Sequence, residues 1–266
     1  MGLADYERTK GESPVALILA MVNQKGGVGK TTTAVNLTAA LTALGKKVLL
    51  CDFDPQANAT SGLGAEKGRG VTSYDLVING ASAAEAVVHT DFGDLIPSSP
   101  ALSGAGVELV GSEGREFALA RALEPIRDQY DLIFIDCPPS LELLTLNALC
   151  AADGIFVPVQ CEYYALEGLS DLMATLRAVK RKLNPTLRLF GVLLTMYDGR
   201  TNFSAQVAEE VRRHFPGQVY ATVIPRNVRL SEAPSHGLPV RAYDKYSRGA
   251  AAYEALASEI VEKEVL

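Results

Sequence analysis

Short apolar segments alternate along the chain with longer segments in which apolar residues recur at helical spacing. Several of the short segments are apolar at almost every position, which is typical of parallel strands that helices cover on both faces. Such alternation is characteristic of βαβ units. The pattern therefore predicts an α/β fold with a mostly parallel sheet and helices on both of its faces.

The boundaries of the predicted strands and helices follow from the same apolar pattern. The predicted strands are Leu17–Val22, Lys47–Cys51, Asp94–Pro97, Leu132–Ile135, Ile155–Val159, Leu189–Met196 and Tyr220–Ile224. The predicted helices are Thr31–Leu44, Glu116–Gln129, Leu143–Ala152, Leu166–Leu183, Ser204–His214 and Arg248–Lys263. The Gly- and Ser-rich stretches 61–73 and 98–114 are expected to form loops around the sheet.

Length and composition set the domain count. The chain has 266 residues, of which 48% are hydrophobic, enough to bury one large core. We expect residues 15–266 to form a single domain and the polar residues 1–14 to form a flexible tail. No stretch approaches the roughly 18 apolar residues of a membrane span, and the first residues lack a signal-peptide pattern. A cytoplasmic protein without a membrane partner is expected.

A glycine-rich segment, Asn23–Thr32, lies between the first predicted strand and the first predicted helix. Glycines allow backbone N–H groups to turn toward phosphate oxygens, and the helix N-terminus adds a positive dipole. In a phosphate-binding loop of this kind, Lys30 reaches the β- and γ-phosphates and Thr31 is a ligand of Mg²⁺. The predicted ATP-binding residues of this loop are Lys25, Gly26, Gly27, Val28, Gly29, Lys30, Thr31 and Thr32.

The loop departs from the usual pattern G-x-x-x-x-G-K-[ST], because Gln24 stands where the first glycine is expected. It reads K-G-G-x-G-K-T-T instead and resembles the deviant Walker-A loop of the P-loop NTPases that include ParA/Soj, MinD and the nitrogenase iron protein. In that family, a lysine at the place of Lys25 contacts the nucleotide of a second subunit. The resemblance thus implies a homodimer that forms on ATP binding, with Lys25 and Lys30 both catalytic.

Three acidic residues follow predicted strands at the edge where ligands bind in open α/β sheets. Asp52 and Asp54 lie in the segment Asp52–Gln56, and Asp136 ends an apolar run. The run before Asp136 has the Walker-B form, in which the acid binds Mg²⁺ through its water shell. By resemblance to the family, Asp54 orients the attacking water, and Asp52 supports either the Mg²⁺ shell or the same water. ATP and Mg²⁺ are the expected cofactors.

Long segments later in the chain resemble the ParA/Soj family in particular. They are residues 158–168, 194–202 and 223–237, and the resemblance covers roughly residues 15–260. It implies that Pro225 and Asn227 lie against the adenine and that Arg226 helps to frame the base. It also implies that Arg200 and Arg229 contact DNA without sequence preference. The role of Tyr163 and Tyr164, within the first segment, does not follow from the residues.

The charge distribution agrees with a nucleic-acid partner. The net charge is −6, but residues 177–248 hold 13 Lys/Arg and 5 Asp/Glu, or +8, which leaves −14 for the remainder. Such a basic region on an acidic protein is either an electrostatic footprint for phosphate or a scattered, solvated surface. The segment contains both Arg200 and Arg229.

The function expected from the resemblance is ATP-dependent DNA segregation. An ATP-bound sandwich dimer would bind nonspecific double-stranded DNA, and hydrolysis stimulated by a ParB-type centromere-binding protein would release it, which places the protein at the nucleoid. A MinD-like membrane-positioning ATPase is the alternative, but its basic amphipathic end is missing: residues 254–266 hold four glutamates and one lysine. A redox protein like the iron protein would need cysteines such as Cys137 and Cys161 to hold a cluster. Both lie in apolar settings, which favours buried thiols.

Overall fold

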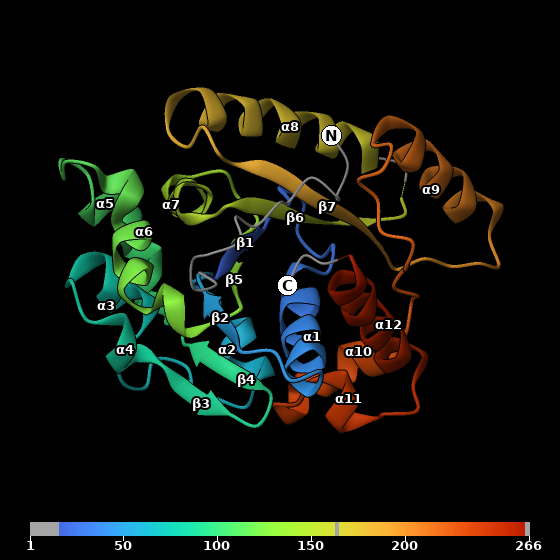
Figure 1. Ribbon diagram of the computed structural model, residues 1–266, viewed down its shortest axis with the longest axis horizontal. Helices are drawn as coiled ribbons and strands as arrows, with labels where there is room; N and C mark the ends of the chain where they lie inside the picture. Colours follow the sequence, from blue (N-terminus) through green and yellow to red (C-terminus); the bar gives the residue numbers. More distant parts are fainter. Residues whose placement is uncertain (1–15, 163–164, 264–266) are drawn as a thin grey trace.

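The computed structural model of the chain describes residues 16–162 and 165–263, so the predicted tail 1–14 and the pair Tyr163–Tyr164 lie outside it. A seven-stranded sheet runs through the centre in the order β3-β4-β2-β5-β1-β6-β7 (Figure 1). The strands are β1 (Leu17–Met21), β2 (Val48–Asp52), β3 (Val88–Thr90), β4 (Gly93–Ile96), β5 (Leu132–Asp136), β6 (Gly154–Gln160) and β7 (Arg188–Thr195). Among the strand pairs of the described residues, only β3–β4 is antiparallel, which confirms the predicted mostly parallel sheet.

Helices cover both faces of this sheet. One face carries α1 (Lys30–Ala43), α2 (Asn58–Gly62), α10 (Val228–Glu232), α11 (Val240–Tyr243) and α12 (Arg248–Glu262). The other carries α3 (Ser73–Ile78), α4 (Ala83–Ala86), α5 (Ala105–Glu108), α6 (Ala118–Leu123), α7 (Leu143–Ala151), α8 (Ala165–Lys182) and α9 (Asn202–His214). Strand residues alternate between the two cores: in β5, Ile133 and Ile135 join the α7 side, and Leu132 and Phe134 the α1 side. The predicted two-sided covering is confirmed.

The predicted strand Tyr220–Ile224 is wrong. Its two ends hydrogen-bond to β7, through Tyr220 N to Val192 O and Ile224 N to Leu194 O. Between them, the N–H groups of Ala221 and Thr222 donate to the Glu259 carboxylate at 2.8 and 2.9 Å. Consecutive N–H groups of a strand point in opposite directions, but these two both donate to one carboxylate from α12. The segment therefore crosses the edge of the sheet without forming a strand.

Two other predictions need correction. The helix expected over 116–129 is broken into α6 and two 3₁₀ segments, η2 (Arg115–Phe117) and η3 (Glu124–Gln129). Pro125 lacks a backbone N–H and lies at the junction of α6 and η3, which explains that break. The loop expected over 98–114 contains η1 (Pro100–Gly104) and α5, and the short edge strand β3 was not predicted.

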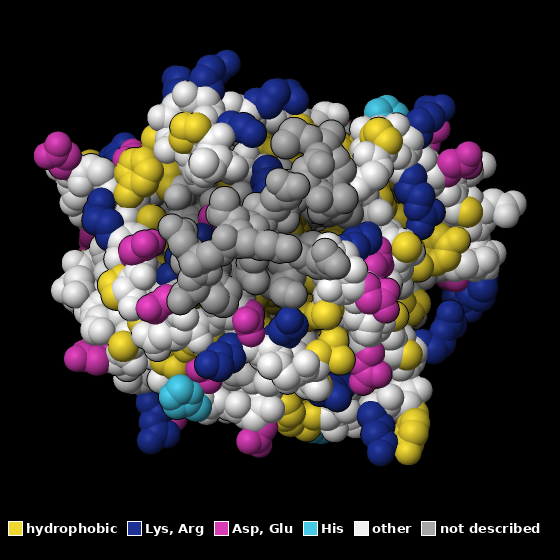
Figure 2. All heavy atoms as spheres, viewed as in Figure 1, with side chains coloured by type: hydrophobic (Ala, Val, Ile, Leu, Met, Phe, Trp, Pro, Cys, Tyr) yellow, Lys and Arg dark blue, Asp and Glu magenta, His cyan; other side chains and the backbone are white. Residues whose placement is uncertain are grey.

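The basic segment 177–248 does not form one surface. It includes the second half of α8 and α9 on one face of the sheet, and α10 and α11 on the other. On the face shown in Figure 2, charged side chains of both signs are spread over the surface, and Lys and Arg side chains gather along the edge above α8. The charge counted along the sequence is therefore divided between separate parts of the molecule.

Gly191 in β7 is required by close packing. A Cβ added there would lie 2.4 Å from Cε2 of Tyr220, whose ring is fully buried and stacked on Phe156 at a centroid distance of 5.2 Å. We expect Gly191→Ala to lower the free energy of unfolding by about 1–3 kcal/mol, because the packed ring has to move. Urea denaturation measures the change.

Gly168→Ala is the matched control, because Gly168 is helical and a Cβ there meets nothing within 4 Å. That variant is expected to keep or raise stability, by up to about 1 kcal/mol. Equal destabilisation by both variants would contradict the packing explanation.

Candidate nucleotide-binding site

Three neighbouring strands bring the site together. In the register of β2, β5 and β1, Asp52 pairs with Asp136, and Asp136 pairs with Met21. The three strands therefore end at the same level, and the chain segments that leave them lie side by side. The two predicted acidic sites and the glycine-rich loop meet at this carboxyl edge of the sheet, where open α/β folds bind ligands.

The glycine-rich loop joins β1 to α1 in the expected way. Gly27 and Gly29 have positive φ, at 73° and 93°, and Gly29 precedes the first residue of α1. Asn23 fixes the start of the loop: its Nδ2 donates to Pro158 O at 2.8 Å, and its Oδ1 accepts from Lys25 N at 3.0 Å. Thr195 Oγ1 donates to Val28 O at 2.8 Å from the end of β7. Hydrogen bonds to β6 and β7, two strands on the same side of β1, thus fix the loop.

The two lysines of the loop point to different places. Lys30 is buried, and its ammonium donates to the carbonyl oxygens of Asn23 and Lys25 at 3.0 and 3.3 Å. Burial lowers the pKa of Lys30, an effect that nearby Asp136 opposes. Lys25 instead pairs with Glu162 at 2.8 Å, and both side chains are almost half exposed. Lys30 therefore serves its own loop, whereas Lys25 is available at the surface.

Asp136 and Thr31 fit a magnesium ion. Thr31 Oγ1 donates to Asp136 Oδ2 at 2.7 Å. The other oxygen, Oδ1, is buried and accepts no hydrogen bond from the part of the chain that is described. An unpartnered buried carboxylate oxygen beside a hydroxyl is a suitable place for the water shell of Mg²⁺. Burial, followed by the charge of Asp52, raises the pKa of Asp136, and a bound cation would offset both effects.

Asp52 and Asp54 have different surroundings. Asp52 is fully buried, and its carboxylate accepts from Thr60 N, Thr60 Oγ1 and Asp54 N at 2.7–3.2 Å. Burial raises the pKa of Asp52 to about 6. Asp54 accepts from Gln56 N through Oδ1, while Oδ2 has no partner among the described residues. Asp52 therefore positions the segment that carries Asp54, and the predicted role of Asp54 in orienting a water stays a prediction. The predicted role of Asp52 at Mg²⁺ stays a prediction.

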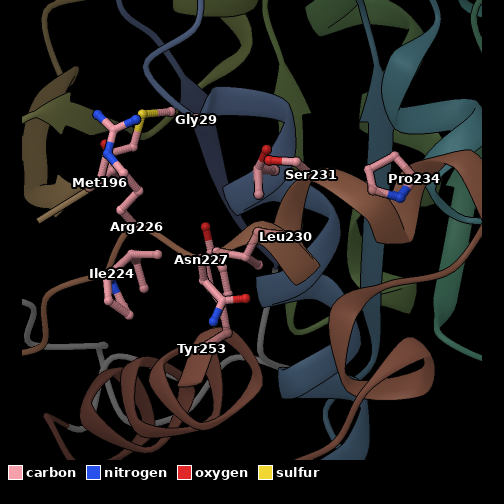
Figure 3. A pocket seen from close by; sticks show the side chains of 12 residues that line it. Gly29, Met196, Ile224, Arg226, Asn227, Leu230, Ser231, Pro234 and Tyr253 are labelled. Carbon is pink, nitrogen blue, oxygen red and sulfur yellow. The ribbon is translucent and has the colours of Figure 1, made fainter. Parts of the chain in front are cut away.

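A hollow of about 260 Å³ adjoins the loop and contains the segment predicted to hold the base (Figure 3). Its lining comes from the loop, the end of β7, segment 224–227, α10 and α12: Gly29, Thr32, Thr195, Met196, Ile224, Pro225, Arg226, Asn227, Leu230, Ser231, Pro234 and Tyr253. Met196 adopts the left-handed conformation at φ 51°, and next to it Tyr197 pairs with Ile224 and Arg226 through backbone hydrogen bonds. The structure thus brings the three predicted base-contacting residues together beside the phosphate loop.

The two predicted DNA-contacting arginines are exposed but already paired. Arg200 makes a bidentate contact with Asp198, at 2.9 and 2.8 Å. Arg229 pairs with Glu232 at 2.7 Å and with Asp244 at 3.2 Å. The hydrogen bonds from Arg200 lower the pKa of Asp198 to about 2. In this arrangement, acidic neighbours balance the charge of both arginines.

Comparison with known proteins identifies the family. The family described as an AAA domain matches residues 16–189. The sporulation initiation inhibitor protein Soj of Bacillus subtilis is 56% identical over 246 residues, which cover 91% of this chain and 97% of that protein. The chain belongs to the ParA/Soj family. The chromosome-partitioning ATPase Soj of Treponema pallidum is similar at 52% identity, covering 92% of this chain and 97% of that protein.

Solved structures agree with the nucleotide site. Cobyrinic acid a,c-diamide synthase from Mycobacterium smegmatis, with ADP and magnesium bound, superimposes with a TM-score of 0.82 at 38% identity, covering 94% of this chain and 96% of that one. The cell division ATPase MinD of Pyrococcus furiosus gives 0.75 at 28% identity, covering 93% and 99%. This ParA/Soj protein is accordingly an ATPase that uses ATP and Mg²⁺. No helix within residues 16–162 and 165–263 is long and apolar enough to cross a membrane.

The candidate cluster cysteines are poor ligands in this ParA/Soj protein. Cys137 and Cys161 are both buried free thiols. Burial raises the pKa of Cys137 well above its usual value and that of Cys161 to about 11. Because iron–sulfur clusters are held by thiolates, these surroundings oppose the redox alternative.

Sequence reasoning missed several residues of the site. Asn23 and Thr195 brace the loop, Thr60 holds Asp52, and Tyr253 lines the hollow and contacts Thr33 Oγ1 at 3.1 Å. No local pattern marks Thr60 or Tyr253, and Thr195 lies in a segment that resembles the family but reaches the loop from the end of β7. Glu162 lies in a segment that resembles the family, but its partner Lys25 is 137 positions away.

The burial of Asp136 predicts that the stability of the folded protein depends on pH. A carboxyl whose pKa is raised in the folded state favours folding below its unfolded pKa, and this contribution is lost as pH rises through the folded value. An amide does not titrate. We therefore expect Asp136→Asn to raise the unfolding midpoint of the nucleotide-free protein at about pH 7.5, and to raise it less at about pH 5.

Mg²⁺ with ATP should stabilise the parent in the same thermal unfolding assay and fail to stabilise the variant, because the ion loses a charged partner. An Asp136→Asn protein less stable than the parent at both pH values would contradict this reading of the site.

Proposed function

We propose that this protein segregates DNA as a nucleotide-dependent dimer. ATP bound at the loop of one copy is completed by Lys25 of a second copy, and the sandwich dimer binds double-stranded DNA without sequence preference. Hydrolysis, stimulated by a ParB-type centromere-binding protein, returns the chain to the state that releases DNA. The names of the relatives, which include chromosome-partitioning proteins, support this role.

The observation that carries the proposal is the opposite orientation of the two loop lysines. Lys30 is buried in its own loop, so each copy already places one positive charge beside the phosphates that it binds. Lys25 is held at the surface by one exposed ion pair with Glu162. Such a pair is worth only about 0–1 kcal/mol, so a partner's phosphates can displace the glutamate. Positioned positive charge is the main contribution of a protein to phosphoryl transfer.

The remaining roles follow from the site. Asp54, with one free carboxylate oxygen, orients the attacking water. Thr31 and Asp136 hold Mg²⁺, which neutralises phosphate charge when bound. Pro225, Arg226 and Asn227 hold the base at the hollow. The described end of α12 carries Glu254, Glu259 and Glu262, so an anionic membrane surface would repel it, and the MinD-like alternative gains no support.

We expect Lys25→Ala to keep ATP binding but to lose the rise of turnover per subunit with protein concentration. The reason is that a group supplied by a second copy acts only in the dimer. Steady-state ATPase rates over a range of protein concentrations provide the measurement, and Lys47→Ala, at an exposed lysine away from the site, is the control. A Lys25→Ala protein that hydrolyses ATP as the parent does would remove the lysine from the reaction.

We expect the double variant Arg200→Ala/Arg229→Ala to bind DNA more weakly in the presence of ATP. The logarithm of the DNA-binding constant falls linearly with the logarithm of salt concentration, and the loss of two phosphate contacts should make this slope shallower by about 2. ATP binding should stay unchanged, since neither side chain contacts the hollow or the loop. Fluorescence anisotropy with a labelled duplex measures the slope, and Arg69→Ala/Arg121→Ala is the charge-matched control. Unchanged affinity would show that Arg200 and Arg229 lie outside the DNA surface.

A further inference from the structure

The backbone of Asp54 is held from two sides by a ring of hydrogen bonds. Asp54 N donates to Asp52 Oδ1 at 3.2 Å, and Ser98 Oγ donates to Asp54 O at 2.8 Å. Thr60 closes the ring. Its N and Oγ1 each donate to Asp52 Oδ2 at 2.7 Å, and its Oγ1 accepts from Ser98 N at 2.9 Å. We call Asp52, Thr60 and Ser98 the Asp54 clamp.

The clamp joins three parts of the chain at the carboxyl edge of the sheet. Asp52 ends β2, Thr60 lies in α2, and Ser98 follows β4 by two residues. Strands β2 and β4 are parallel neighbours, with Cys51 opposite Ile96. The segment after β4 therefore runs beside the segment that carries Asp54. This register brings Ser98 to the carbonyl of Asp54, 44 positions away in the sequence.

The clamp is closed to solvent. Asp52, Thr60 and Ser98 are all fully buried, and Asp54 is only 7% exposed. In such surroundings no water replaces a hydrogen bond that is lost, so removal of one hydroxyl leaves a buried partner unsatisfied. The peptide of Asp54 must then shift to find another partner. The position of Asp54 consequently depends on side chains that lie behind it.

The turn after Asp54 needs such support. Ala57 adopts the left-handed conformation at φ 51°, and its N–H donates to Asp54 O at 2.9 Å. This conformation is unfavourable for a residue with a Cβ and persists only where the surroundings fix it. The carboxylate of Asp54 belongs to the same turn, because its Oδ1 accepts from Gln56 N. Ser98 thus holds the oxygen on which the turn is built.

We propose that Ser98 and Thr60 are positioning residues for ATP hydrolysis, which hold the peptide of Asp54 so that its carboxylate faces the attacking water. This inference rests on the proposed role of Asp54, but it depends on neither DNA nor Lys25. Displacement of a reacting group by about 1 Å can cost about 100-fold in rate. Neither Ser98 nor Thr60 lines the hollow beside the phosphate loop, so the clamp acts on turnover and not on nucleotide binding.

The first test is Ser98→Ala. We expect kcat for ATP hydrolysis to fall about tenfold or more, while KM for ATP stays within about twofold of the parent value. Binding of a fluorescent ADP analogue should be unchanged. Ser73→Ala is the matched control. Ser73 is also fully buried and donates through its N–H to Pro97 O at 2.8 Å, but its hydroxyl has no hydrogen-bond partner among the described residues. It should keep the kcat and KM of the parent.

A second pair of variants separates the hydroxyl of Thr60 from its shape. Thr60→Val keeps the shape and removes the hydroxyl, so kcat should fall as in Ser98→Ala. Thr60→Ser keeps the hydroxyl and should retain kcat within about threefold. Because Thr60 and Ser98 belong to one ring, the double variant Ser98→Ala/Thr60→Val should lose less than the product of the two separate losses. Fully multiplicative losses would contradict a single ring.

Thermal unfolding of each variant reveals a purely structural role. A lower unfolding midpoint for Ser98→Ala and Thr60→Val, with the kcat of the parent, would show that the clamp only stabilises the fold and would overturn the proposal. Loss of ADP binding together with kcat would overturn it as well, because the whole site would then be distorted. So would an equal fall of kcat in Ser73→Ala.

Asp54→Ala distinguishes this inference from the proposed function. If Asp54→Ala is inactive but Ser98→Ala and Thr60→Val match the parent, only the clamp inference fails. If Asp54→Ala hydrolyses ATP as the parent does, the proposed role of Asp54 fails and the clamp inference fails with it. If the clamp variants lose kcat while turnover per subunit of the parent stays flat with protein concentration, the inference stands and the site shared between two copies fails.

Discussion

The register of β2, β5 and β1 is the constraint on which the site depends. Because Asp52, Asp136 and Met21 occupy the same level, the segment that carries Asp54, the acid proposed to bind Mg²⁺ and the phosphate loop leave the sheet together. A shift of one residue would turn Asp136 to the opposite face and separate it from Thr31. The two apolar cores fix the register, since strand residues alternate strictly between them.

The same constraint has an energetic cost. Asp52 and Asp136 are fully buried, and burial, together with the charge of Asp54, raises the pKa of both. Asp52 is compensated by Thr60 and by the backbone of Asp54, whereas Asp136 keeps one oxygen unpartnered among the described residues. Buried polar groups are normally satisfied, so an exception beside a phosphate loop marks the place where stability is given up for ligand binding.

The sequence predicted those parts of the molecule that depend on local pattern. Apolar runs located all the central strands, and the loop and its acids were identified from their spacing together with the resemblance to the family. What could not be predicted depends on distant partners. Glu259 from α12 prevents 220–224 from forming a strand, and Glu162 holds Lys25 across 137 positions. Likewise, the basic stretch counted along the chain did not reveal that its charges lie on two faces of the sheet, or that carboxylates pair with several of them.

In the proposed dimer, one active site is made from two copies of the chain: Asp54 and Lys30 come from the copy that binds ATP, and Lys25 comes from its partner. Complementation in mixtures tests it directly. A Lys25→Ala subunit keeps Asp54, and an Asp54→Ala subunit keeps Lys25, so each is expected to be nearly inactive alone. In a mixture, the heterodimer contains one complete site, and we predict ATP hydrolysis that approaches half the parent rate per heterodimer. Activity no greater than the sum of the two separate variants would contradict a site shared between subunits.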